Sequence, residues 1–208
     1  VNAAGERFAD DSFHPAIVAA ALRPAESGTP AHLPFFMIWD ETHHQRYGLG
    51  ATMPGQDYPD GLVTSALTIA GLAGALGLPI AGLEAATRRF NEQAATGGDT
   101  DFGRGSNLSV RRFRGDWNHR PNPCLGPVVE PPFFGMRMRL LNTGIAAAGV
   151  RAGLFGRVLT EEGDVIDNLY AVGECSDRAA AGVGYNSGYS LSRAMTYGYL
   201  AAWDITRC

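Results

Sequence analysis

The sequence lacks the features that mark several broad classes of protein. Its three cysteines, Cys124, Cys175 and Cys208, lie far apart and form no CxxC pair, so neither a disulfide framework nor a zinc site is indicated. The net charge is −4 and basic residues form no long block, which argues against a nucleic-acid-binding surface. The longest apolar stretch, Leu62 to Leu83, is broken by glycines and by Pro79 and predicts no membrane span. We therefore expect a protein of the reducing cytoplasm.

The chain also lacks a starting methionine and a signal peptide, and it opens on Val1-Asn2, which is typical of internal sequence. We expect it to be a piece of a longer protein. Its 208 residues, 45% of them hydrophobic, suffice for one large or two small globular domains, with many turns from 27 glycines and 12 prolines.

Hydrophobic spacing and turn residues predict a mixture of helices and strands. Helices are expected over residues 17–22, 62–76 and 80–95, with Gly77 and Gly97 as the stops of the last two, and strands over residues 33–39, 133–141 and 152–159. Residues 99–122 are weakly patterned and predict a loop.

The stretch from Asn168 to Trp203 organises the rest of the chain. A short apolar run, which predicts a buried strand ending at Glu174, stops at Gly173-Glu174. A glycine-rich loop covers residues 182–188, and a helical pattern opens at Ser190. A strand, an acidic residue, a glycine loop and a helix N-terminus together present backbone N–H groups to an electron-rich ligand.

Three segments resemble the flavoprotein superfamily of fumarate reductases and 3-ketosteroid dehydrogenases. They are NxxGxRFxDD (residues 2–11), FNEQAATGGDTDFGRG (90–105) and GRVLTEEGDVIDNLYAVGE (156–174). Three more are most similar to the 3-ketosteroid dehydrogenase branch: RGDWNHRPNPCLGP (114–127), PPFF (131–134) and the ending AMTYGYLAA (194–202). The resemblance implies an α+β fold, with a fumarate reductase-type cap (substrate) domain in residues 1–142 and the C-terminal part of a Rossmann-like FAD-binding domain in residues 143–208.

The resemblance also implies a missing half. Enzymes of this superfamily begin with a Rossmann half whose G-x-G-x-x-G turn holds the FAD pyrophosphate. Here Gly182-x-Gly184-x-x-x-Gly188 has the wrong spacing and no βαβ context, so it is interpreted as an active-site loop. We expect the N-terminal half of the FAD domain to lie outside these residues, and this piece alone to be inactive.

By resemblance, Gly173 and Glu174 face the FAD ribitol, whose hydroxyl the carboxylate binds. Tyr189, Ser190 and Leu191 begin the helix whose positive end stabilises negative charge on the flavin as hydride arrives at N5. The alternatives are a solvated acid at a strand end for Glu174 and ordinary helix capping for Ser190.

Tyr185 and the Gly188 amide match, imperfectly, the two donors that polarise the substrate carbonyl in the steroid branch. The family places a tyrosine base where this chain has His14-Pro15, so His14 is the candidate base, with a surface or capping histidine as the alternative. Arg46 and Tyr47 follow Asp40 where fumarate reductases place a proton-delivering arginine; a surface arginine beside a packed tyrosine is the preferred interpretation.

His43-His44 has no third ligand at suitable spacing, so no metal is expected. Trp117 and His119 are further candidates for lining the pocket. By resemblance, fumarate reductases take the cationic side chains that bind a dicarboxylate from the stretches that correspond to residues 142–146 and 182–190. Neither stretch contains histidine or arginine here, so nothing would offset the burial of two carboxylates, and a neutral, apolar ketone fits better. The resemblance thus predicts an FAD-dependent dehydrogenase acting on the CH–CH bond beside the carbonyl of a 3-ketosteroid-like substrate. The alternatives are a fumarate reductase-like enzyme with another substrate and a non-catalytic piece without flavin.

Overall fold

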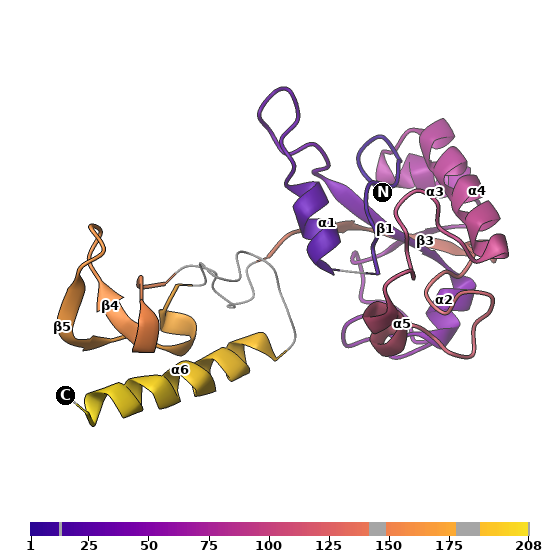
Figure 1. The fold of residues 1–208 in the computed structure, drawn as a ribbon. Helices are drawn as coiled ribbons and strands as arrows, with labels where there is room; N and C mark the ends of the chain where they lie inside the picture. The colour runs from indigo at the N-terminus through magenta and orange to yellow at the C-terminus, as the bar shows by residue number, and fades with distance from the viewer. Residues whose placement is uncertain (13, 142–148, 178–187, 208) are drawn as a thin grey trace. The chain divides into compact units, whose positions relative to one another are not determined.

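The computed structural model describes residues 1–12, 14–141, 149–177 and 188–207, and the chain forms two compact units, Val1–Leu140 and Leu141–Cys208 (Figure 1). Helices combine with antiparallel strands in both, which confirms the α+β class. The first unit contains α1 (His14–Ala21), β1 (Phe35–Asp40), α2 (Glu41–Arg46), β2 (Thr64–Ala66), α3 (Ile69–Leu76), α4 (Ile80–Thr96), α5 (Leu108–Arg114) and β3 (Phe133–Met138). The second contains η1 (Leu154–Gly156), β4 (Arg157–Leu159), β5 (Val165–Tyr170), η2 (Gly173–Cys175) and α6 (Tyr189–Ile205).

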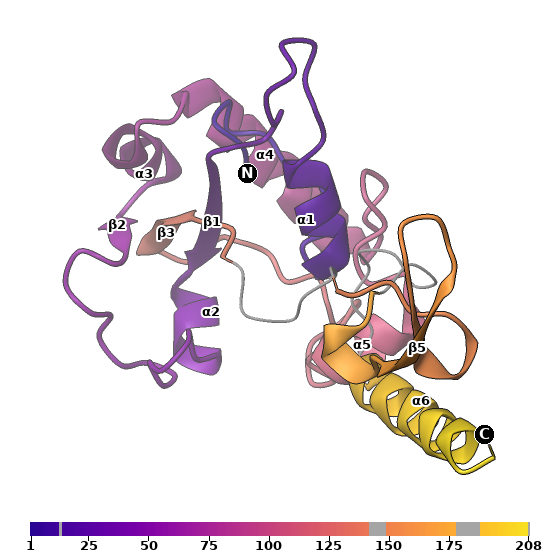
Figure 2. The same ribbon diagram turned by 90° about the vertical axis from the view of Figure 1, so that its left-hand side faces the viewer.

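The first unit is built on a three-stranded antiparallel sheet in the order β1-β3-β2. Helix α3 packs against β2, β3 and α4, as Figure 2 shows. At Gly135 of β3 a Cβ atom would lie 2.6 Å from the end of the Leu76 side chain, so the absence of a side chain here leaves room for Leu76 of α3. The core beneath the helices is apolar and contains Phe36, Ala73, Leu78 and Leu83.

The expected helix ends are confirmed where glycine marks them. Gly77 and Gly97 follow α3 and α4 with φ of 71° and 79°, the left-handed conformation that glycine adopts without a Cβ penalty. The predicted strands over residues 33–39 and 133–141 are confirmed as β1 and β3.

Two predictions for the first unit are wrong in part. The expected helix over residues 62–76 begins only at Ile69, because Thr68 accepts the Gly71 N–H as its N-cap and residues 64–66 pair with β3 instead. Residues 99–122 are not all loop, since Asn107 accepts the N–H groups of Ser109 and Val110 and starts helix α5.

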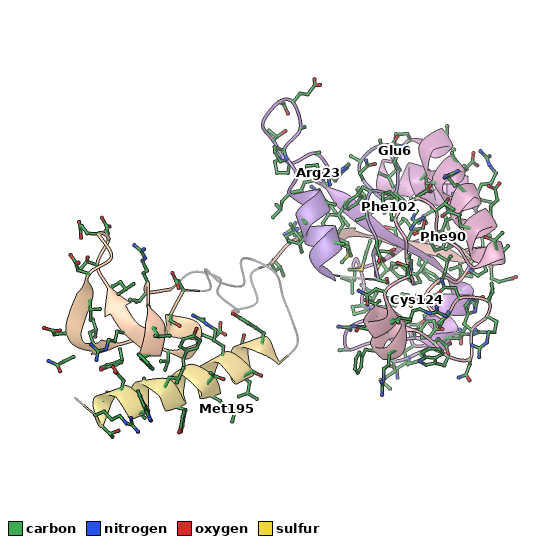
Figure 3. All side chains as sticks on the ribbon, viewed as in Figure 1. Glu6, Arg23, Phe90, Phe102, Cys124 and Met195 are labelled. Carbon is green, nitrogen blue, oxygen red and sulfur yellow. The ribbon has the colours of Figure 1, made fainter. Side chains whose placement is uncertain are left out.

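A buried ion pair joins the N-terminal motif to the motif after α4. Arg7 donates from both Nη atoms to Asp99, at 3.1 and 2.7 Å, and lies over the rings of Phe90 and Phe102, both labelled in Figure 3. Asp99 also accepts the backbone N–H of Arg104 at 3.1 Å. Burial acts to raise the pKa of Asp99, but the bonds from Arg7 and Arg104 outweigh it and lower that pKa. The two motifs therefore meet to hold the loop after α4.

In the second unit, α6 packs against η1 and η2, the two short turns on either side of the β4–β5 hairpin (Figure 1). Asp204 of α6 accepts Arg157 Nε at 2.6 Å and the Tyr170 hydroxyl at 2.9 Å, which connects the helix to both strands. Phe155 stacks on Trp203 with ring centroids 5.6 Å apart. The strand expected over residues 152–159 is confirmed only for β4, because residues 154–156 form the 3₁₀ turn η1 with Phe155 at a φ of 64°.

Candidate functional site

Glu174 lies in the short 3₁₀ turn η2, and its side chain is exposed. The expectation that it ends a buried strand is wrong: β5 stops at Tyr170, pairs antiparallel with β4 and is largely exposed. Gly173, just before it, is buried and has a φ of 68°. A left-handed residue at this point turns the chain sharply, and the turn directs the Glu174 carboxylate to the surface of the unit.

Helix α6 begins at Tyr189, one residue before the predicted start, with Gly188 as its N-cap at a φ of 82°. No side chain caps this end, so the capping role considered for Ser190 does not apply. The first main-chain bond back to the cap is from Ser192 N–H to the Gly188 carbonyl, at 3.0 Å. The N–H groups of Ser190 and Leu191 point beyond the helix, where they make no hydrogen bond within the described ranges.

Arg193 connects these two elements, and the sequence motifs did not indicate it. Its Nη1 atom donates to the carbonyls of Gly173 at 3.2 Å and Ser176 at 3.3 Å. Its Nη2 atom donates to Ser176 Oγ at 2.8 Å and to the carbonyl of Asp177. We call this set of contacts the Arg193 clamp. A cation in the first half of a helix opposes the helix dipole, and that unfavourable placement was the one available signal in the sequence.

The Arg193 clamp is reinforced by close packing. A Cβ atom on Gly173 would lie 3.4 Å from the Ala194 Cβ, so the helix and the turn approach each other at two small residues. Ser176 is buried, and its hydroxyl also donates to the Gly173 carbonyl at 2.9 Å. The turn and the first two turns of α6 therefore form one fixed piece of structure.

This fixed piece has the chemistry that a flavin ribityl and isoalloxazine group requires. The Glu174 carboxylate makes no hydrogen bond or ion pair to any described residue and is free to accept one from a hydroxyl. The N–H groups of Ser190 and Leu191, in the first turn of α6, carry the partial positive charge of the helix end. One acceptor on the turn and two donors on the helix, on elements that the Arg193 clamp joins, fit the cofactor that the sequence resemblance implies.

Two of the three residues predicted to act on the substrate have side chains outside the described residues. Tyr185 and the turn at 142–146 lie outside the described residues. His14 is the first residue of α1, but its side chain is also outside the description. Gly188 is described and exposed at the start of α6. The roles of Tyr185, Gly188 and His14 toward a substrate therefore stay predictions.

The polar run after β1 forms α2 and has a structural role. Asp40 caps the helix by accepting the His43 N–H, and the Tyr47 hydroxyl donates to Asp116 at 2.6 Å. Arg46 is exposed. The arginine is thus at the surface, as the preferred interpretation expected, whereas Tyr47 is 36% exposed and is held by its hydrogen bond to Asp116 rather than by burial.

His44 is buried between two acceptors. Its Nε2 lies 3.0 Å from the Gln56 carbonyl oxygen and its Nδ1 lies 3.1 Å from Glu41 Oε2. Both nitrogens can donate only when the ring is protonated, so the Gln56 carbonyl first and Glu41 second raise the pKa of His44. Both ring nitrogens are engaged, and no group of three or more His, Cys, Asp or Glu side chains in the described ranges is placed to hold a metal.

Trp117 and His119 belong to the loop after α5. Trp117 is 53% exposed, and its carbonyl accepts Arg120 Nη1 at 2.6 Å. His119 Nε2 donates a hydrogen bond to the Leu125 carbonyl oxygen, at 3.0 Å. Both residues have local contacts that account for their positions.

Among the described helices, none is long and apolar enough to cross a bilayer.

Comparison with known proteins gives matches along nearly the whole chain. Residues 1–192 match the family model described as FAD binding domain. The 3-oxosteroid 1-dehydrogenase of Mycobacterium tuberculosis (strain H37Rv) is 35% identical over 99% of this chain and 38% of its own length. The 4-oxocyclohexanecarboxylate 2-dehydrogenase of Sinomonas cyclohexanicum is 35% identical over 99% of this chain and 36% of its own length.

A solved structure is similar as well. The 3-ketosteroid Δ1-dehydrogenase of Sterolibacterium denitrificans, in complex with 1,4-androstadiene-3,17-dione, superposes with a TM-score of 0.86 at 33% identity. The superposition covers 99% of this chain and 38% of that one. The chain thus spans somewhat more than a third of the length of the relatives it matches.

Proposed function

Because this chain belongs to the FAD binding domain family, we propose that it is part of an FAD-dependent dehydrogenase that introduces a C=C bond beside the carbonyl of a cyclic ketone. Family membership confirms the expected resemblance to 3-ketosteroid dehydrogenases, and FAD is the cofactor that goes with it. The observation that carries the proposal is the match, over 99% of the chain, to two enzymes whose names both describe the dehydrogenation of a ring ketone.

The described residues have clear roles in such a reaction. The Glu174 carboxylate, on the turn η2, accepts a hydrogen bond from a cofactor hydroxyl and thereby fixes the position of the cofactor. The N–H groups of Ser190 and Leu191, with Tyr189 at the helix start, place partial positive charge where negative charge grows during the reaction. When bound, FAD supplies the chemistry of hydride acceptance. These assignments place the cofactor-facing residues on η2 and α6.

The substrate side follows from the same resemblance. Tyr185 and the Gly188 amide donate to the carbonyl oxygen, which acidifies the neighbouring C–H bond. A base, for which His14 is the candidate, accepts that proton while the adjacent carbon loses its hydride. The electron pair of the C–H bond that loses its proton becomes the new C=C bond, and the pair of the other C–H bond leaves with the hydride, so the substrate loses one proton and one hydride. Residues 1–142 then serve as the cap and residues 143–208 as the closing part of the FAD domain.

The preferred substrate is an apolar 3-ketosteroid. In residues 182–190 no histidine or arginine offers a partner for a second carboxylate. The relative from Sinomonas cyclohexanicum is named for a ketone that carries a single carboxylate, which makes a small oxo-acid the substrate to compare. A fumarate reductase-like reaction is the runner-up.

The test uses the full-length protein. We expect a yellow preparation whose flavin absorbance bleaches under anaerobic conditions when a 3-ketosteroid is added, and bleaches more slowly with 4-oxocyclohexanecarboxylate. Tyr185→Phe should slow the bleaching by roughly 100-fold, the usual cost of one oxyanion donor, without releasing flavin. A colourless protein, or a yellow one that no ring ketone reduces, would refute the proposal. Oxidation of a reduced dye by fumarate would support the runner-up.

A further inference from the structure

We infer that Arg193 is a positioning residue for the cofactor, which sets the geometry of the Glu174 turn relative to the start of α6. The inference rests on the proposed function, because it assigns a role toward the FAD of the same site. It concerns a residue that none of the sequence motifs includes. Its basis is the set of contacts within the second unit alone.

The first observation is the direction of the contacts. The Arg193 guanidinium donates to three main-chain carbonyls and one hydroxyl, all between Gly173 and Asp177. Its position is in the second turn of α6, so one side chain spans the helix and the turn that bears Glu174. The planar guanidinium, with five N–H donors in fixed directions, can bind several acceptors at once, which an ammonium cannot do with the same geometry.

The second observation is that the turn has few other restraints. Glu174 and Cys175 are exposed, and the adjoining strand β5 is largely exposed too. Apart from Arg193, the hydrogen bonds of the turn are local: Ser176 bonds to the Gly173 carbonyl, Cys175 to the Val172 carbonyl, and Val150 to residues 175 and 177. The Arg193 clamp adds hydrogen bonds from α6, beside the packing of Gly173 on Ala194. Removing the clamp leaves that packing to position the acceptor on the turn relative to the donors at the helix end.

The third observation is electrostatic. A cation in this part of a helix is disfavoured by the dipole, so its presence needs compensation from acceptors, which Gly173, Ser176 and Asp177 supply. The positive guanidinium charge and the positive end of the helix dipole then lie on the same side of the unit. Both stabilise an electron-rich group bound at the helix end.

The experiment compares four variants of the full-length flavoprotein. Arg193→Gln removes both the positive charge and the planar guanidinium with its N–H donors, whereas Arg193→Lys keeps the charge but not the guanidinium. Ser176→Ala removes one acceptor and leaves Arg193 in place. Arg207→Gln is the matched control, because Arg207 lies beyond the other end of α6 with its guanidinium 4.0 Å over the Trp203 ring. Each apoprotein is titrated with FAD, and the visible circular dichroism and midpoint potential of the bound flavin are recorded.

We expect Arg193→Gln to weaken FAD binding by about tenfold or more, the usual effect of losing one charge-assisted hydrogen bond or several. Arg193→Lys should be intermediate, and Ser176→Ala should weaken binding less than Arg193→Gln. The flavin circular dichroism should change in Arg193→Gln and recover partly in Arg193→Lys, a signature that lost stability alone would not produce. Arg207→Gln should match the wild type in every readout.

Unchanged FAD affinity and flavin spectra in Arg193→Gln, with only a lower melting temperature, would overturn the inference. If Arg193→Gln does not fold, Arg193→Lys and Ser176→Ala decide, and wild-type affinity in both would overturn it as well. The proposed function fails separately: a wild-type protein that binds FAD but is reduced by no ring ketone contradicts the substrate and leaves the Arg193 result intact.

Discussion

Replacing Arg7 by methionine tests whether the buried ion pair with Asp99 holds the loop after α4. The chain contains a close comparison, because Arg89 pairs with Asp101 two residues further along the same loop. The side chains of Arg7 and Asp99 are 14% and 0% exposed, whereas those of Arg89 and Asp101 are 60% and 22% exposed. The two pairs share the same chemistry and differ mainly in contact with solvent.

The expected magnitude follows from what Asp99 loses and keeps. Arg7→Met removes two donors from a carboxylate that no solvent reaches, and removing one partner of a buried pair costs about 3–5 kcal/mol. Asp99 keeps the backbone N–H groups of Asp101, Phe102 and Arg104. The methionine side chain also keeps apolar contact with Phe90 and Phe102. We therefore expect the lower end of the range, about 3 kcal/mol.

The assay is amide hydrogen exchange, read by mass spectrometry on peptides that cover residues 97–106. A loss of about 3 kcal/mol in the opening free energy speeds exchange by roughly 100-fold. Arg89→Met should leave the rate close to that of the wild type, because solvent screens the exposed pair. Raising the salt to about 1 M should reduce any Arg89 effect and leave the Arg7 effect in place. Equal, small effects of the two substitutions would refute the reasoning.

Two further predictions concern elements that the structure revealed. Asn107→Ala removes the side chain that accepts the Ser109 and Val110 N–H groups, so helix α5 should lose about 1 kcal/mol, and its amides should exchange several-fold faster. Unchanged exchange over residues 108–114 would show that the cap is unimportant. For His44, the raised pKa means that protonation stabilises the fold. This contribution is fully present below the unfolded pKa of about 6.5 and is lost as the pH rises through the higher folded value. The melting temperature should therefore fall between acidic and alkaline pH by more in the wild type than in His44→Gln; parallel curves would contradict this assignment.

Long elements bounded by glycine could be predicted from the sequence. Helix α4 shows apolar residues at helical spacing and ends at Gly97, and both signals are local. Residues 64–66 could not be assigned correctly, because their pairing with β3 joins segments nearly 70 residues apart. Helix α5 has only seven residues and one cap, too little for a periodic pattern to be visible.

In the candidate site too, features with a local sequence signature could be predicted, and features that depend on distant contacts could not. Gly173 and the start of α6 were found because a glycine turn and a helix N-terminus have signatures within a few residues. Arg193 was missed because three of its four acceptors are main-chain carbonyl oxygens, 16 to 20 residues away in the chain, and no residue type encodes a carbonyl oxygen. The strand before Glu174 was predicted to be buried because a short apolar run does not tell a buried strand from an exposed hairpin.

The Arg193 clamp also bears on how this site can diverge. Three of its four acceptors are carbonyl oxygens, which every amino acid provides. Mutations at positions 174, 175 and 177 can therefore alter the charge and size of the loop while the attachment to α6 persists. Gly173 and Ser176 are constrained by packing and by a hydroxyl bond. The turn can thus acquire new side chains, and with them new preferences, without first losing its anchor.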